Sequence, residues 1–168
     1  MTLTMHTATV PTCARALNNF AAILEKAAAH AEARKINPAV LLGTRLFPDM
    51  LPLAMQIQLA NGSASSGAAR LAGAEVPSFE TKERGFPEWI GETRATIAFL
   101  ESLQPAQFEG SAERTVTWQT RSSTKSMQGM PYLLHHVLPN MFFHVTTAYD
   151  ILRQSGLEIG KMDYLGRS

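Results

Sequence analysis

His144 is the side chain in this sequence whose type and surroundings point most directly to chemistry. An imidazole exchanges protons near neutral pH and binds transition metals. Two arrangements are open: a polar or proton-handling group in a pocket between helices, or a core histidine held by one hydrogen bond, which is the favoured one. The expected partners are Gln56 and Asp49, which stand seven residues apart and share a face if both lie on one helix. Because buried polar groups must be paired, such a cluster would be a binding site or would fix the register of two helices.

Two further histidines, His135 and His136, are adjacent in the sequence. Neighbouring side chains on a helix point about 100° apart, so this pair does not bind one ion from a single helix face. They either line the mouth of a pocket, for which His136 is a candidate, or lie with one side chain half-buried and the other exposed, which is the favoured interpretation.

Three other side chains are candidates for contact with a ligand. Tyr149 and Arg153 stand four residues apart and therefore share a helix face. Arg153 either binds an anionic ligand or anchors a tail or a neighbouring helix, and anchoring is the commoner role of such an arginine. Trp118 either stacks on a ligand or covers the core, and covering is favoured.

Composition, apolar runs and missing motifs argue against nucleic-acid binding, membrane insertion and several common catalytic sites. The chain has 15 Lys and Arg against 14 Asp and Glu, so its net charge of +1 gives no reason to expect nucleic acid or an anionic membrane as a partner. No apolar run approaches the ~20 residues that span a bilayer, and Met1–Ala22 lacks the pattern of a signal peptide. One cysteine, Cys13, allows no internal disulfide, which fits the cytoplasm and a small buried apolar side chain. The sequence also lacks a phosphate-binding loop, a serine nucleophile elbow and a Cys/His metal motif.

Helical periodicity covers most of the first hundred residues. Apolar and small residues recur every 3.6 positions, and Asn37 with Pro38 is typical of a helix start. Gly73 is a natural helix end. The expected helices are Leu3–Arg34, a short turn from Pro38 to Gly43, Pro48–Ala72 and Phe86–Leu103.

After Leu103 the helical period of apolar residues gives way to other patterns. Alternation around Thr115–Gln119 predicts a small β-hairpin over Arg114–Met127. Pro139 predicts a break between a short helix, Tyr132–Val137, and a longer one, Asn140–Gln154, with Asn140 as its cap.

The tail, Leu157–Ser168, is predicted to be extended and partly docked, with an ion pair between Lys161 and Asp163. Together these elements predict one all-α domain over residues 1–168. The expected architecture is an up-down four-helix bundle with a short helix and a hairpin before the last helix.

A family resemblance rests on the last long helix, the second long helix and the segment around Pro139. The matching residues are Phe143, His144, Thr147, Ala148, Tyr149, Leu152, Arg153, Gly156, Gly160, Lys161 and Asp163; Pro48, Asp49, Met50, Pro52, Leu53, Gln56 and Arg70–Gly73; and Pro139, Asn140 and Phe142. With these residues the chain resembles an uncharacterised bacterial family of the DinB/YfiT-like metalloenzyme superfamily. The resemblance implies a DinB-type four-helix bundle, often a homodimer, and no established activity.

The better-known members of that superfamily hold a divalent metal with three histidines, one on the second long helix and two spaced by four on the last. The resemblance places Gln56, His144 and Ala148 at these positions, so two of the three lack an imidazole and neither a metal nor another cofactor is expected. The favoured hypothesis is a small-molecule-binding protein with an inter-helix pocket near His144. The alternative is a metal-dependent DinB-type enzyme, a thiol transferase or hydrolase, in which His144 acts with a displaced metal site that includes His135 or His136.

Overall fold

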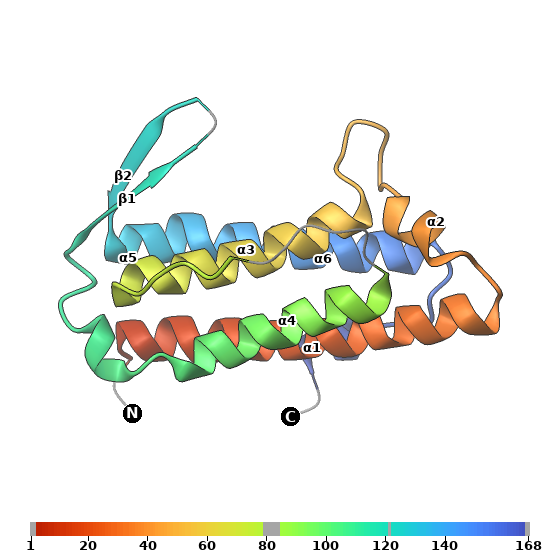
Figure 1. Ribbon diagram of the computed structural model, residues 1–168, viewed down its shortest axis with the longest axis horizontal. Coiled ribbons are helices and arrows are strands. Elements are labelled where there is room, and N and C mark those ends of the chain that lie inside the picture. The colour runs from red at the N-terminus through yellow and green to blue at the C-terminus, as the bar shows by residue number, and fades with distance from the viewer. Residues whose placement is uncertain (1–2, 79–84, 121, 167–168) are drawn as a thin grey trace.

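Four long helices pack as two pairs in this computed structural model, which describes residues 3–78, 85–120 and 122–166. The helices are α1 (Met5–Ala33), α3 (Leu53–Ala72), α4 (Phe86–Ser102) and α6 (Leu138–Gln154). Helix α3 lies along α6 and α1 lies along α4, as Figure 1 shows. Helices α3 and α4 run in the same direction, and each is antiparallel to its partner in the pair. The predicted four-helix bundle is therefore confirmed.

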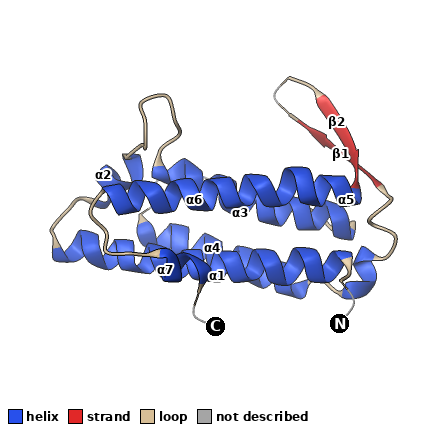
Figure 2. Cartoon of the chain, turned by 180° about the vertical axis from the view of Figure 1, so that it is seen from behind, coloured by secondary structure: helices blue, strands red, loops and turns tan. Residues whose placement is uncertain are grey.

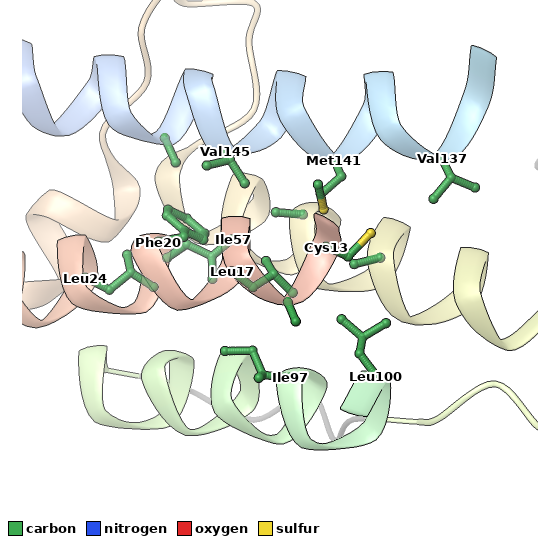
Figure 3. Close-up of a cluster of buried hydrophobic side chains, with 14 of the residues drawn as sticks. Cys13, Leu17, Phe20, Leu24, Ile57, Ile97, Leu100, Val137, Met141 and Val145 are labelled. Carbon is green, nitrogen blue, oxygen red and sulfur yellow. The ribbon is translucent and has the colours of Figure 1, made fainter. Parts of the chain in front are cut away.

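The core between the two pairs is built from the apolar stripes that the periodicity predicts. Figure 3 shows Leu17 and Phe20 of α1 facing Ile57 of α3, with Met141 of α6 and Ile97 of α4 closing the cluster. All are buried, which supplies the main stabilisation of the bundle because apolar area leaves water. Cys13 lies in the same cluster, and burial raises the pKa of its thiol to about 12. It is a buried apolar side chain, as the sequence suggests.

Short elements close the two ends of the bundle. Helix α2 (Pro38–Gly43) is capped by the Asn37 side chain, which accepts from the Ala39 amide at 3.0 Å. At the other end a short 3₁₀ turn, η1 (Pro105–Phe108), leads to an antiparallel hairpin of β1 (Thr115–Gln119) and β2 (Thr124–Gln128). Figure 2 shows this hairpin projecting from the bundle beside α5 (Gly129–Tyr132). The hairpin was predicted over nearly the same residues.

Helix α3 begins at Leu53, five residues later than the sequence predicts. Pro52 is its cap, with extended backbone, and it excludes Leu51 from the helical region because the residue before a proline clashes there. The segment 44–52 forms turns instead, and the Leu53 amide donates to the Thr44 carbonyl at 2.9 Å. The predicted helical position of Asp49 is therefore wrong.

Pro139 does not break the last helix, contrary to the prediction. Helical backbone continues from α5 through a π-helical turn, η2 (Leu133–Val137), into α6. A proline inside a helix removes one N–H and collides with the carbonyl four residues earlier, and the wider π turn makes room for it. Asn140 is not a cap: its side chain donates to the His136 carbonyl at 2.5 Å from within the helix.

The tail contains a short helix, α7 (Lys161–Leu165), where extended chain was predicted. Asp163 caps it by accepting from the Gly160 amide at 2.8 Å. The same carboxylate pairs with Lys26 of α1 at 2.5 Å, so the predicted ion pair with Lys161 is replaced by one to α1. Helix α7 consequently docks on α1.

Across the described residues, no helix combines the length and apolar character needed to cross a membrane.

Candidate functional site

The predicted pairing of His144 with Gln56 is present between α6 and α3. The His144 Nδ1 atom lies 2.7 Å from the Gln56 Oε1 atom, and the Gln56 Nε2 group donates to the Leu51 carbonyl at 3.1 Å. Since the amide nitrogen is directed at a carbonyl, Oε1 is the acceptor toward His144, and Nδ1 carries the proton. Burial lowers the pKa of His144, so the imidazole is neutral at pH 7 with its Nε2 lone pair available.

A DinB-type metal triad does not fit these residues. The Gln56 oxygen already accepts the His144 hydrogen bond, and Ala148 is fully buried with no donor atom. His136 and His144 stand eight residues apart on continuous helix, which is about 12 Å along the axis and too far for one ion. Across the residues that the structure describes, no group of three His, Cys, Asp or Glu side chains is placed to hold a metal.

A polar seam follows the outer side of the contact between α3 and α6. Ser63, Ser66 and Arg70 are spaced by three and four residues on α3, so they share one face. His136 and Asn140 are spaced by four on the facing helix. Near the hairpin the seam opens into a cavity of about 250 Å³. Its lining residues are Leu59, Gly62, Ser63, Ser66, Arg70, Trp118, Gln119, Tyr132, His136, Val137 and Asn140.

Three rings form one wall of this cavity, each from a different element. Trp118 points inward from β1, because alternation in that strand buries Val116 and Trp118 and exposes their neighbours. Its ring centroid lies 4.8 Å from that of Tyr132 and 4.7 Å from that of His136. Tyr132 and His136 are stacked at 5.3 Å, one helical turn apart. The hairpin is thus held to the bundle by a cluster that also lines the cavity.

Arg70 brings a positive charge to the cavity, and no described acidic side chain is paired with it. Arg70 donates through Nη1 to the Tyr132 hydroxyl at 3.1 Å, and within the described part of the chain it has no ion pair. Lys125 stands opposite Trp118 in the hairpin register. Burial, and then the charges of Lys125 and Arg70, lower the pKa of His136, which is neutral at pH 7. None of the lining residues in the described segments carries a carboxylate.

The six residues predicted for the pocket are not all brought together. His136 lines the cavity, while His144 and Gln56 form their pair further along the same seam. Asp49 is exposed in the turns before α3. Tyr149 donates to the Ile159 carbonyl at 3.5 Å and Arg153 to the Leu157 carbonyl at 3.3 Å. Both side chains hold the C-terminal tail, and for Arg153 this is the role that the sequence favours.

Of the adjacent histidines, His135 is exposed and His136 is half-buried, as the favoured interpretation has it, and His136 also lines the cavity, as the alternative has it. The sequence did not single out Arg70, Tyr132 or the serines of α3 as a site. A signal was present: the spacing of Ser63, Ser66 and Arg70 places a polar stripe on a helix otherwise rich in apolar and small residues.

A larger groove of about 410 Å³ lies between α1, α6 and α7. Its charged side chain, Arg15, donates to the Leu165 carbonyl at 3.4 Å, and Asn19 donates to the Tyr164 carbonyl at 3.1 Å. These polar groups hold α7 in place, whereas Arg70 in the smaller cavity faces no acidic side chain of the residues that the structure describes. The smaller cavity is therefore the better candidate site.

The arrangement of the helices and the hairpin defines a helical bundle of the DinB type. A crystal structure of a DinB family member protein from Shewanella denitrificans has the same fold, with a TM-score of 0.90 and 36% sequence identity over 98% of this chain and 93% of that chain. The chain belongs to DUF1993, a domain of unknown function whose family model matches residues 5–165. None of the curated proteins compared with the chain is similar to it.

Proposed function

We propose that the protein binds a small molecule in the cavity between α3, α6 and the base of the hairpin. The observation that carries the proposal is Arg70, a guanidinium that lines the cavity and, among the described residues, meets a neutral phenol and no acid. Arginine offers five donors, so most of its hydrogen-bonding capacity stays available to a ligand. A few polar groups converging beside aromatic walls are typical of ligand sites.

The size of the cavity limits the ligand. A volume of about 250 Å³ lies just below the range of roughly 300–1,000 Å³ that holds drug-sized molecules. A single substituted ring suits it better than a nucleotide or a coenzyme. The His144–Gln56 pair supports the site from further along the seam, because it fixes α3 against α6.

Two helix glycines provide a matched test. An added Cβ atom meets nothing within 4 Å at Gly62, which lines the cavity, or at Gly91 in α4, which does not. Both positions therefore have room for a Cβ atom, and replacing a helix glycine by a better helix former favours stability by up to about 1 kcal/mol.

The proposal predicts that Gly62→Met fills the cavity and abolishes binding of fragments that bind the wild-type protein, while Gly91→Met leaves binding unchanged. Ligand-observed NMR with a library of one-ring fragments, acidic, basic and neutral, measures this. Fragments that bind both variants equally, or no binding by any fragment, would contradict the proposal.

Two further expectations remain proposals. A homodimer is supported by the family resemblance and by the exposed apolar side chains Met130 and Leu134 near the hairpin. Light scattering at micromolar concentration tests it, and a monomeric mass would contradict it. The single buried cysteine supports the cytoplasm as the compartment.

A further inference from the structure

The charge distribution around the cavity favours one sign of ligand. Arg70 lines the cavity, and Lys125 stands opposite Trp118 in the hairpin register, so two positive charges flank its aromatic wall and make the potential there positive. Among the described residues that line the cavity, none carries a carboxylate that would cancel that potential. An anion is therefore attracted, and a cation is repelled, before any specific contact forms.

The shape of the arginine group narrows the kind of anion. A guanidinium is planar and presents paired N–H groups that match the two oxygens of a carboxylate. In Arg70 only the Nη1 bond to Tyr132 is used among the described residues, and that bond orients the guanidinium. The phenol thus acts as a positioning group that holds the guanidinium ready for a second, acidic partner.

The remaining walls indicate what the carboxylate is attached to. The Trp118, Tyr132 and His136 rings supply flat, apolar surface beside Arg70, which favours a planar ring. Ser63 lies seven residues before Arg70, about 10 Å along the same helix face, with Ser66 between them. These hydroxyls would meet a polar group on the far side of a ring whose acid end is at Arg70.

Building on the proposed pocket, we infer that its ligand is a small aromatic carboxylate, with the acid on Arg70, the ring against the aromatic wall and a polar substituent toward Ser63 and Ser66. Neutral aromatic molecules lack the charge-assisted contact. Small inorganic anions lack the ring contact.

The probe is 4-hydroxybenzoate, and 4-hydroxybenzamide is its neutral counterpart of nearly equal shape. Isothermal titration calorimetry on the full chain should show the acid binding at least about tenfold more tightly than the amide, since charge-assisted hydrogen bonds are about twice as strong as neutral ones and each 1.4 kcal/mol is tenfold. Arg70→Gln should remove that preference, and Arg70→Lys should restore only part of it. Inorganic phosphate should compete poorly.

Tyr132→Phe and melting curves serve as controls. The substitution keeps the charge of Arg70 and removes only its anchor, so it should weaken the acid more than the amide without loss of the fold. Melting temperatures establish that the Arg70 variants remain folded. The comparison of acid with amide on the wild-type protein needs no variant at all.

Several outcomes would overturn the inference. These are equal affinity for acid and amide, an acid preference that survives Arg70→Gln, or phosphate competing as well as the aromatic acid. Binding of neutral fragments alone, sensitive to Gly62→Met, would also overturn it while leaving the proposed pocket intact. If no fragment binds in any arm, both the inference and the proposed function fail.

Discussion

His144 and His136 lie on one helix of the bundle, and each is held in its neutral form by the fold. Burial lowers the pKa of His144, and burial with two nearby cations lowers that of His136. Each imidazole is oriented by an amide: Gln56 for His144, and Asn140, whose Nδ2 atom lies 3.4 Å from the His136 Nδ1 atom. Of these two imidazoles, only that of His136 lines the candidate cavity, so only it can contact a ligand there.

The lowered pKa values predict how stability depends on pH. A histidine whose pKa is lower in the folded state than its ordinary value of about 6.5 binds protons more readily when the chain is unfolded. Its stabilisation is therefore complete above about pH 6.5 and is lost as the pH falls below that value. We expect the free energy of unfolding, measured by urea denaturation, to decrease from pH 7 to pH 5.

His144→Gln should flatten this pH dependence, because the substituted side chain does not titrate. His135→Gln, a change at an exposed neighbour on the same helix, is the matched control and should keep the wild-type slope. An unchanged slope in His144→Gln would show that this imidazole is not the buried neutral group described above.

Helix α3 approaches the π turn η2 closely. A Cβ atom built on Gly67 would lie 2.4 Å from the Cγ1 atom of Val137, closer than such atoms can approach. Gly67 is thus required by packing, while Gly62, one and a half turns earlier on the same helix, has open space around it. The contrast provides a test of how the π turn packs against α3.

We expect Gly67→Ala to lower the free energy of unfolding by about 1–3 kcal/mol, the usual cost of overpacking. Gly62→Ala should raise it by up to about 1 kcal/mol, since alanine is the better helix former. Chemical denaturation of both variants measures the difference. Adding Val137→Ala to Gly67→Ala should recover part of the loss, and equal stability of the two single variants would contradict the described packing.

Helix-capping and proline preferences, read from the local sequence, predicted most of the elements. They failed where tertiary packing opposed a local preference. Asn37 and Gly73 mark helix ends as expected, because each meets a local backbone requirement. Pro52 and Pro139 show the opposite outcomes for one residue type. Pro52 caps the start of α3, whereas Pro139 lies inside a continuous helix because the preceding π turn, packed against α3, makes room for its ring. The sequence around Pro139 does not show whether the proline starts a helix or lies within one, because tertiary packing decides this.

At the scale of the whole molecule, the candidate site depends on three segments that are distant in sequence. Arg70 comes from α3, Trp118 from the hairpin, and Tyr132 and His136 from the start of the last helix. Figure 1 shows that the hairpin leaves the bundle at the end where α3 finishes, which brings these segments together. The pairing of His144 with Gln56 followed from the helix pattern and the resemblance. The cavity did not, because the sequence does not give the direction in which the hairpin folds back.

The two tryptophans allow the most direct test of the central claim, that a small molecule binds beside the hairpin between α3 and α6. Trp118 lines the cavity, and Trp89 lies in α4 on the other helix pair. Their indole N–H signals can be followed in two-dimensional NMR during titration with 4-hydroxybenzoate or any fragment that binds. The Trp118 signal should shift in a saturable way while the Trp89 signal stays in place. A shift confined to Trp89, or a saturable ligand that moves neither signal, would contradict the account.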